Sequence, residues 1–340
     1  MILIDAVFIH TGGGKSLLDY LISELNKTDA EVSYLLDLRY KSQMPEINGN
    51  VEFVNGFFNR CKFYNKNKNK FSKIFCLGNI PPHLPLKHTQ VLMYLHSASY
   101  LNTGVQTTLK QKITQYVKNK IFYALLKNSN LWMVQTGYIQ KLFQKKAGIP
   151  THKIKVLPFF KSIEKSSEII NKEKNSFFYP GTAEPHKNHK RLIDAFCIFY
   201  DQYKIGYLYL TVEERFKEIF DYINLKKSQS YPIINLGYIS NKKDVGKAYY
   251  KAEYLVFPSL LESFGLPLIE APEFNCKIIA SKLDYVAQVC VPSYTFDPYD
   301  VLNMSEAFAN VVQHNNLPES HAIVHNEINQ VISYIINEKN

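Results

Sequence analysis

The chain has 340 residues, enough for two ordinary domains that each bury a core of their own. Its hydrophobic content of 46%, with 14% aromatic residues, excludes an intrinsically disordered chain. The formal net charge of +10 indicates an anionic partner. No segment approaches the ~18 consecutive apolar residues of a membrane span, and there is no basic leader, so a cytoplasmic protein is expected.

Strand and helix signals alternate through the first 160 residues. An apolar strand is predicted over residues 2–8, and residues 16–25 have apolar side chains at helical spacing. Further strands are predicted at 31–36, 73–77, 90–95, 131–134 and 154–157. This alternation is typical of an α/β domain with a parallel sheet, which we expect to span residues 1–160.

A triglycine turn, Gly12 to Gly14, joins the first strand to the first helix. It is not a P-loop, because Ile9 stands where that motif requires a glycine. It is not a Gly-x-Gly-x-x-Gly motif either, because Leu17 occupies the third position. What remains is a turn whose backbone N–H groups can meet a phosphate, with an ordinary tight turn as the alternative.

The excess positive charge belongs to the first half of the chain. Residues 1–160 carry 21 basic and 8 acidic side chains, and residues 53–163 contain no Asp or Glu, whereas residues 161–340 have a net charge of −3. Such a surface attracts a polyanion or an anionic membrane, unless its lysines are merely solvated. No recognised RNA- or DNA-binding motif accompanies the charge, so nucleic acid is not expected as a partner.

Residues 109–127 are predicted to form a basic amphipathic helix within this stretch. Its lysines lie mostly on one side, and the apolar residues of the other side are Ile113, Tyr116, Val117, Ile121, Ala124 and Leu125. A helix that packs on the sheet through its apolar face is the ordinary interpretation. An interfacial helix in peripheral contact with an anionic membrane is the alternative.

The composition changes after Pro158, and the polar residues 161–175 are expected to be a linker. Strands are then predicted at 177–179, 207–210, 233–236, 255–257, 277–280 and 294–296, separated by helical segments. They indicate a second α/β domain over residues 176–318. The tail, residues 319–340, is predicted to be helical.

Residues 254–271 are predicted to run from a buried strand through a loop into the start of a helix, with one glutamate in the loop and a second in the helix. The apolar run ends at Pro258, and a helix is predicted to begin near Pro267. Glu262 lies in the loop before it, where it can accept hydrogen bonds from sugar hydroxyls. Glu270 lies about one turn into the helix, where a carboxylate can take two ribose hydroxyls. This arrangement indicates a nucleotide-sugar site.

The groups expected to hold a diphosphate precede helices. The N–H groups of Phe264, Gly265 and Leu266 would point at an anion. Lys187 precedes a second helical segment, so its ammonium can reach phosphates that the helix N-terminus favours. The two histidines that flank Lys187 lack a third ligand, and no metal site is predicted.

Residues 254–271 resemble the Glu-x7-Glu motif of the retaining glycosyltransferases of family 4, the group 1 enzymes with a GT-B fold. The match is specific because Phe-Pro-Ser precedes Glu262 and Phe-Gly-Leu-Pro stands between the two glutamates. Residues 179–196 resemble the family's strand, glycine turn and Lys-Asn helix start, and residues 235–239 and 294–298 resemble two further landmarks.

The resemblance implies two Rossmann-like domains whose parallel sheets face each other across a cleft, with the acceptor on the first and the donor on the second. It also implies that the helix in residues 319–340 packs back toward the first domain. The implied reaction is transfer, with retention, from a UDP- or GDP-linked sugar to a glycan or lipid-diphosphate-linked acceptor, as in bacterial surface polysaccharide synthesis at the inner face of the plasma membrane. No cofactor and no metal is implied, because Lys187 and helix dipoles would neutralise the leaving phosphate.

The resemblance also assigns roles to single residues. The expected catalytic residues are Glu262, Lys187 and His96, the last at the end of a strand and in contact with a sugar hydroxyl. The expected donor-binding residues are Glu270, Phe264, Gly265, Leu266, Gly13, Gly14, Gly181 and Thr182.

Thr182 departs from the family pattern, in which most members carry an arginine just after the glycine. One of two expected diphosphate cations is therefore missing, or supplied by Lys190 or Arg191. A non-catalytic nucleotide-sugar-binding subunit of a glycan assembly complex is one alternative function, since a fold does not guarantee activity. A GT-B phosphorylase or non-hydrolysing epimerase is another, and it accounts less well for the two glutamates.

Overall fold

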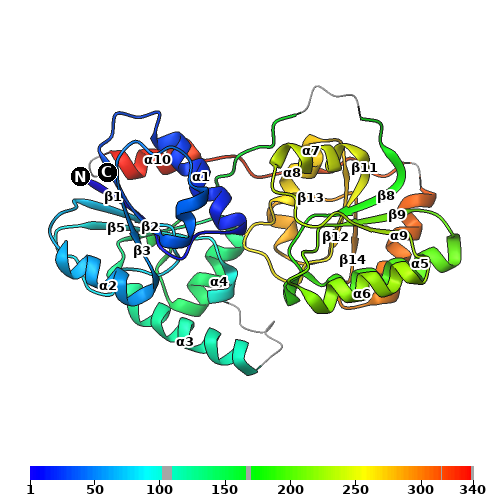
Figure 1. Cartoon of the computed structure of the whole chain (residues 1–340), viewed down its shortest axis with the longest axis horizontal. Helices are drawn as coiled ribbons and strands as arrows, with labels where there is room; N and C mark the ends of the chain where they lie inside the picture. Colours follow the sequence, from blue (N-terminus) through cyan, green and yellow to red (C-terminus); the bar gives the residue numbers. More distant parts are fainter. Residues whose placement is uncertain (102–108, 166–169, 315, 338–340) are drawn as a thin grey trace. The chain divides into compact units, whose positions relative to one another are not determined.

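The computed structural model describes residues 1–101, 109–165, 170–314 and 316–337. The chain divides into two compact units (Figure 1). Unit 1 holds Met1–Lys161 together with His325–Asn340, and unit 2 holds Ser162–Val324. Each unit has a parallel sheet of its own, which confirms the predicted α/β class.

Unit 1 is built on a seven-stranded sheet in the order β3-β2-β1-β4-β5-β6-β7. Its strands are β1 (Ile2–Ala6), β2 (Val32–Asp37), β3 (Asn50–Val54), β4 (Lys73–Cys76), β5 (Gln90–Leu95), β6 (Leu131–Val134) and β7 (Ile154–Val156). Only β3 was not predicted. It is an edge strand, and its polar residues alternate with apolar ones, so it lacks the continuous apolar run of the central strands.

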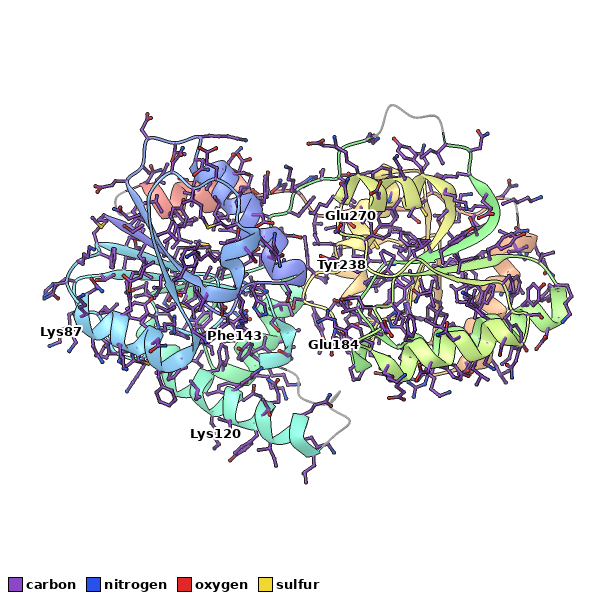
Figure 2. The ribbon with its side chains drawn as sticks, viewed as in Figure 1. Lys87, Lys120, Phe143, Glu184, Tyr238 and Glu270 are labelled. Atoms are coloured by element: carbon purple, nitrogen blue, oxygen red, sulfur yellow. The ribbon has the colours of Figure 1, made fainter. Side chains whose placement is uncertain are left out.

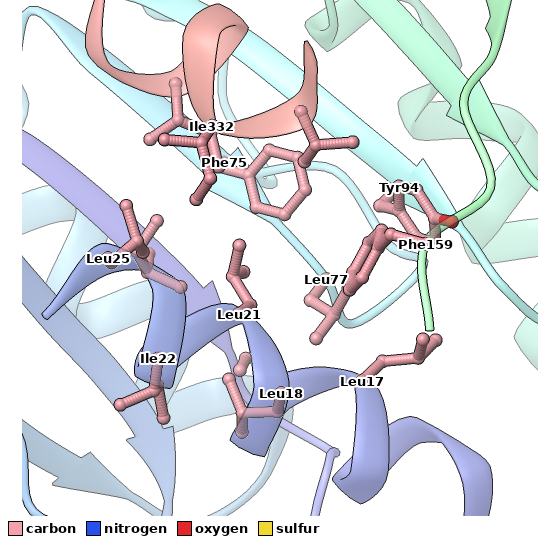
Figure 3. Packing of buried hydrophobic residues seen from close by; sticks show 14 of the residues in the cluster. Leu17, Leu18, Leu21, Ile22, Leu25, Phe75, Leu77, Tyr94, Phe159 and Ile332 are labelled. Carbon is pink, nitrogen blue, oxygen red and sulfur yellow. The ribbon is translucent and has the colours of Figure 1, made fainter. Parts of the chain in front are cut away.

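The helices of unit 1 are α1 (Gly12–Leu25), α2 (Gly56–Lys66), α3 (Leu109–Leu125), α4 (Gly137–Ala147) and α10 (Ile328–Ile336), with short 3-10 helices η1 (Leu38–Gln43), η2 (Ala98–Tyr100), η3 (Leu126–Asn128) and η4 (Thr151–Lys153). The apolar residues of α1 recur at helical spacing, and Leu18, Leu21 and Ile22 are completely buried. They pack with Phe75 of β4 and with Phe159 in one core (Figure 3).

The C-terminal helix belongs to the core of unit 1. The predicted helix over 319–340 begins only at Ile328, because residues 321–322 form a strand, and residues 338–340 lie outside the described part of the chain. Ile332 packs near the α1 leucines (Figure 3). Lys73 Nζ donates to the carbonyl oxygens of Tyr334 and Asn337, so a lysine of β4 satisfies the C-terminal end of α10.

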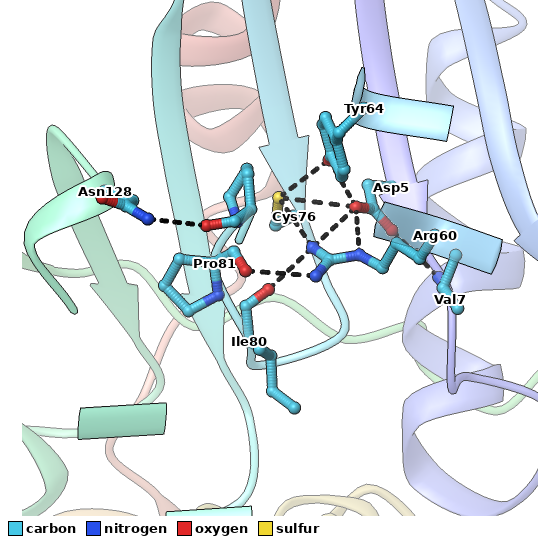
Figure 4. A network of polar contacts seen from close by, with 9 residues as sticks. Asp5, Val7, Arg60, Tyr64, Cys76, Ile80, Pro81 and Asn128 are labelled. Atoms are coloured by element: carbon cyan, nitrogen blue, oxygen red, sulfur yellow. Dashed lines mark hydrogen bonds and ion pairs between the residues drawn. The ribbon is translucent and has the colours of Figure 1, made fainter. Parts of the chain in front are cut away.

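A buried ion pair ties α2 to the sheet of unit 1 (Figure 4). Arg60 and Asp5 are 2% and 1% exposed, and Arg60 Nε donates to Asp5 Oδ2 at 2.7 Å. Arg60 also donates to the carbonyl oxygens of Ile80 and Pro81 at 2.8 and 3.1 Å, and Tyr64 donates to Asp5 at 2.5 Å. The network therefore holds the loop that follows β4.

Helix α3 packs through a different face from the one predicted. Its buried anchor is Phe122, whose ring lies 5.8 Å from Trp132 and 6.1 Å from Phe143. Apolar residues of the predicted packing face are exposed instead, among them Ile113, Tyr116 and Val117, with Leu109 one turn before them. Lys120 lies on the outer side of α3, whereas Phe143 lies inside the unit (Figure 2). The contacts of the Phe122 ring with Trp132 and Phe143 fix the packing face.

Unit 2 is built on a six-stranded parallel sheet in the order β10-β9-β8-β11-β12-β14. Its strands are β8 (Glu173–Tyr179), β9 (Tyr207–Leu210), β10 (Ile233–Asn235), β11 (Ala252–Phe257), β12 (Lys277–Ser281) and β14 (Tyr294–Phe296), with β13 (Cys290–Val291) and β15 (His321–Ala322) as an antiparallel pair. Its helices are α5 (His189–Tyr203), α6 (Lys217–Ser228), α7 (Lys242–Lys251), α8 (Pro267–Glu273) and α9 (Val301–Gln313), with 3-10 helices η5 (Pro185–Lys187) and η6 (Val286–Gln288). Among the described residues, no helix has the length and apolar character needed to cross a membrane.

Candidate functional site

Lys187 and Glu262 meet in unit 2. Lys187 Nζ donates to Glu262 Oε1 at 2.6 Å, and the two side chains are 18% and 11% exposed. Lys187 lies in η5 after β8, and Glu262 lies in the loop after β11. Because β8 and β11 are neighbouring parallel strands, their C-terminal ends bring both residues to one edge of the sheet. The structure thus joins two predicted residues that are 75 positions apart in the sequence.

Hydrogen bonds join the two loops that carry this ion pair. The N–H of Leu260 donates to the carbonyl of His186 at 2.7 Å. The Tyr179 hydroxyl donates to the carbonyl of Lys187 at 3.0 Å and lies 2.8 Å from the hydroxyl of Ser259. Hydrogen bonds between the two loops therefore fix the backbone positions of Lys187 and Glu262, in addition to the contact between their side chains.

Asn188 holds the start of α5 in place. It adopts a left-handed conformation with φ of 62°, which asparagine tolerates better than most residues. Its Nδ2 donates to the carbonyl oxygens of Pro258 and Pro298, and its Oδ1 accepts from Arg191 at 3.0 Å. Asn188 thereby links the loops after β8, β11 and β14 at the edge that carries Lys187.

Glu270 lies in α8 and has a partner on α7. Its Oε2 accepts a hydrogen bond from the Tyr249 hydroxyl at 2.9 Å. Burial raises the pKa of the Glu270 carboxyl above its usual value, whereas the Tyr249 bond and the charge of Lys242 lower it and Glu273 raises it. The Glu262 carboxylate thus has a lysine as its partner, whereas the Glu270 carboxylate has a tyrosine hydroxyl.

The backbone between the two glutamates turns sharply into α8, close to the predicted start of this helix. Gly265 has φ of 83°, a conformation that favours glycine, and a Cβ there would lie 3.1 Å from the Leu268 side chain. Phe264 is buried against the domain, Leu266 precedes the helix, and Pro267 is its first residue. Anion binding by this turn stays a prediction.

Gly181 and Thr182 follow β8 and are both half-buried. The two cations proposed as substitutes for an arginine at Thr182 have partners of their own. Lys190 forms an ion pair at 3.3 Å with a carboxylate one turn along α5, and Arg191 donates to Asn188. Lys187 is therefore the cation of this loop whose partner, Glu262, is itself a predicted site residue.

Burial lowers the pKa of both histidines beside Lys187. His189 is 2% exposed, and its ring lies tilted against Tyr179 with 4.8 Å between the ring centroids. Burial, with Lys187 as a further cause, lowers its pKa to about 3. The pKa of His186 is also lowered, first by burial. In the part of the chain that the structure describes, no group of three or more His, Cys, Asp and Glu side chains is arranged to hold a metal.

Gly13, Gly14 and His96 come together in unit 1. Helix α1 begins at Gly12, earlier than the predicted start at residue 16, so Gly13 and Gly14 lie in its first turn. A Cβ on Gly14 would lie 3.1 Å from Cε1 of His96, which follows β5. The glycine turn and the histidine are thus direct neighbours at the C-terminal edge of the sheet.

Asn79 fixes the ring of His96. Its Oδ1 accepts from the N–H groups of His96 and Ser97 at 2.9 and 3.1 Å, so its Nδ2 is the donor to His96 Nε2 at 2.9 Å. Burial lowers the pKa of His96 to about 4, with the carbonyl groups of Leu77 and of His96 itself as opposing causes. The imidazole is neutral at pH 7, and its proton resides on Nδ1.

A cavity of about 550 Å³ lies elsewhere in unit 2. It is bordered by α7 and by the edge of the sheet, and its lining residues include Phe178, Tyr209, Leu236, Tyr238 and Lys251. Its volume suits a small molecule. None of the predicted site residues lines it.

The segment that carries Lys187, Glu262 and Glu270 lies within the region that matches a known protein family. Residues 160–328 match the glycosyl transferases group 1. The matched segment contains the ion pair, Glu270 and α8. Over 167 residues, 48% of this chain, the sequence is 26% identical to the O-antigen chain mannosyltransferase RfbU of Salmonella typhimurium, and the match spans 46% of that protein's length.

Solved structures similar to the whole chain show the fold of the segment that matches the group 1 family and of unit 1. HepE of Anabaena, in complex with UDP and glucose, has a TM-score of 0.69 at 14% identity and covers 99% of this chain and 95% of its own. The lipopolysaccharide outer core galactosyltransferase WaaB has a TM-score of 0.62 at 16% identity, over 92% of this chain and 91% of its own. The predicted GT-B fold is confirmed.

Sequence reasoning missed three side chains that bind the predicted site residues or the loops that carry them: Asn79, Asn188 and Tyr249. Each of them makes a hydrogen bond between segments that are distant in the sequence, and the spacing of residues along the chain does not predict such a contact. The asparagine that follows Lys187 carried a local signal, since this residue type is enriched in left-handed turns before helices.

Proposed function

We propose that this chain is a retaining glycosyltransferase that moves a sugar from a UDP- or GDP-linked donor to a glycan or lipid-diphosphate-linked acceptor in bacterial surface polysaccharide synthesis. The observation that carries the proposal is the Lys187–Glu262 ion pair at the edge of the unit 2 sheet, in the segment that matches the group 1 family. UDP in the HepE structures supports a UDP-linked donor, and the name of RfbU supports a polysaccharide acceptor.

The proposed chemistry needs positive charge at the phosphates more than it needs an acid and a base. The bond between the anomeric carbon and the phosphate oxygen breaks, and the acceptor oxygen bonds to that carbon on the same face. The proton of the acceptor hydroxyl passes to the departing phosphate. Lys187 has three N–H donors, so it can keep its bond to Glu262 and still contact the phosphate without a metal.

The roles of the other residues follow from their places. Glu262 accepts from sugar hydroxyls and Glu270 from ribose hydroxyls. Gly265 lets the diphosphate approach the turn before α8. In unit 1, His96 offers a sugar hydroxyl an uncharged hydrogen-bonding group beside the turn that contains Gly14.

Glu270→Ala is expected to abolish nucleotide binding and leave the fold intact. The variant removes a charged hydrogen-bond acceptor, and each such bond is worth about 1.5–3 kcal/mol. Calorimetry with UDP and GDP, after a thermal-shift screen over nucleotide sugars, measures the effect. Unchanged nucleotide affinity with a native circular dichroism spectrum contradicts the ribose assignment.

One observation favours a non-catalytic nucleotide-sugar-binding subunit as the second candidate. Thr182 supplies no charge, and both neighbouring cations of α5 are bound elsewhere, so the diphosphate site has a single described cation from this loop. The two candidates differ in one measurement. Slow hydrolysis of a donor sugar by the purified chain, lost in Glu262→Gln, supports the enzyme, and binding without any turnover supports the subunit.

We also propose that α3 contacts an anionic membrane. Leu109, Ile113, Tyr116 and Val117 lie on its outer side and are between 50% and 74% exposed. The exposed lysines of the same helix include Lys112, Lys118 and Lys120. An exposed apolar stripe beside lysines fits the boundary between anionic headgroups and acyl chains.

Replacing Lys112, Lys118 and Lys120 by glutamine is expected to weaken binding to acidic-lipid vesicles about 100-fold at low salt, because each lysine near the surface contributes about 1 kcal/mol. Binding of the unchanged chain should fall steeply with salt. Vesicle co-sedimentation at two salt concentrations measures both effects, and transfer to a soluble acceptor analogue should be unaffected.

The control removes the same charge from unit 2. Lys174, Lys204 and Lys227 are exposed, and their replacement by glutamine should leave vesicle binding nearly unchanged. Equal losses in both triple variants would show a general charge effect. No vesicle binding at any salt concentration would show that the α3 lysines only solvate the fold.

A further inference from the structure

Glu270 of α8 is half-buried, and its carboxylate already has a hydrogen-bond partner on α7 in the free protein. One carboxylate oxygen, Oε2, accepts from the Tyr249 hydroxyl at 2.9 Å. Among the described residues, no hydrogen bond reaches the other oxygen, Oε1. The two oxygens of one carboxylate therefore have different roles in the free protein, and only one of them is available to a ligand.

Tyr249 is held rigidly. It is completely buried, and its ring stacks on Phe274 with 5.6 Å between the ring centroids and 17° between the ring planes. The ring of Phe178 makes an edge contact with it, with 5.2 Å between the centroids and 77° between the planes. Burial and the nearby Glu270 raise the pKa of Tyr249 well above its usual value. Its hydroxyl is protonated at every working pH, so it donates to Glu270 in a fixed direction.

We propose that Tyr249 positions Glu270 for the donor, because its hydroxyl holds Oε2 and leaves Oε1 to accept from the ribose hydroxyls. The inference rests on the proposed function, in which Glu270 binds ribose. Tyr249 does not touch the reacting atoms, so it is a positioning residue. Burial is the largest influence on the Glu270 carboxyl and raises its pKa, and Glu273 raises it as well, whereas the Tyr249 bond and the charge of Lys242 lower it.

Tyr249→Phe is the sharpest test, because the ring and its contacts with Phe274 and Phe178 remain. The variant is expected to bind UDP or GDP, whichever the unchanged chain binds, about 10-fold more weakly. The pH dependence should also change. The charged form of Glu270 loses a stabilising bond in the variant, so the pKa of this carboxyl rises. As the pH is lowered, nucleotide affinity should therefore begin to fall at a higher pH in the variant than in the unchanged chain.

Tyr250→Phe is the matched control on the same helix. The Tyr250 ring meets Phe274 edge-on at 4.8 Å, and its hydroxyl is not a partner of Glu270 in the described structure. This variant should keep the nucleotide affinity within about 2-fold and keep the pH profile. A merely structural role of the two tyrosines predicts similar, pH-independent losses in both variants, which would overturn the proposal.

A readout without ligand separates this inference from the proposed function. Carbon-13 NMR titration of the Glu270 carboxyl should show a higher pKa in Tyr249→Phe than in the unchanged chain. An unchanged pKa overturns the positioning role, whatever the nucleotide does. A raised pKa, with Glu270→Ala still binding nucleotide normally, supports the Tyr249–Glu270 coupling and refutes the ribose assignment instead.

Discussion

Lys187→Met is expected to lower the rate of sugar transfer by about 100-fold or more, because it removes the cation assigned to the leaving phosphate, and one preorganised donor of this kind is worth about 10²–10³ in turnover. Turnover at saturating donor is the measurement. The substitution also leaves Glu262, which is 11% exposed, without its partner at 2.6 Å, so the free energy of unfolding should fall as well. Unaltered turnover would remove Lys187 from the site.

The double variant Lys187→Met with Glu262→Gln separates stability from chemistry. The Glu262→Gln substitution removes the charge that needs a partner, so the double variant should be more stable than Lys187→Met alone, although its turnover stays low. Glu262→Gln alone should lower turnover more than nucleotide affinity, because its proposed partner is the sugar. Lys187→Arg keeps the charge and should retain more activity than the methionine variant.

Arg60→Met is expected to destabilise unit 1 by about 3–5 kcal/mol, because Asp5 would remain buried without a counter-ion. The substitution also frees the carbonyl groups of Ile80 and Pro81, so the loop that carries Asn79 should loosen. Urea unfolding followed by fluorescence measures the effect. The single tryptophan, Trp132, is buried in unit 1 and reports on that unit.

Arg215→Met is the control for this variant. The Arg215 side chain is 59% exposed in its ion pair with Glu213, and such pairs contribute at most about 1 kcal/mol. The unfolding midpoint reported by Trp132 should therefore remain close to that of the unchanged chain. A similarly small effect of Arg60→Met would show that the buried pair contributes little to unit 1.

The alternation of apolar strands and amphipathic helices predicted both sheets because it depends on local burial alone. Continuous apolar runs such as residues 91–95 and 255–257 fill strands that are buried on both faces, and apolar residues at a period of 3.6 mark the helices that cover them. The pattern was weaker at the edges. Strand β3 alternates polar and apolar side chains, and β13 and β15 have two residues each, too few to show a period.

The candidate site was predicted as two separate motifs, and only parallel strand order brings them together. Lys187 and Glu262 follow β8 and β11, which become neighbours in the sheet although β9 and β10 lie between them in the sequence. Tyr249 could not be chosen from the sequence over Tyr250, because the direction of each ring on α7 depends on packing against Phe274.

The sequence by itself determined the α/β class, the positions of most strands and the resemblance to the group 1 family, because these depend on local periodicity and on short motifs. The tertiary structure decided which face of α3 packs. Phe122 enters an aromatic cluster with Trp132 and Phe143, and this contact turned Ile113 and Tyr116 outward. The tertiary structure also decided the partners of the site residues, because a hydrogen bond such as Tyr249 to Glu270 depends on where two helices lie.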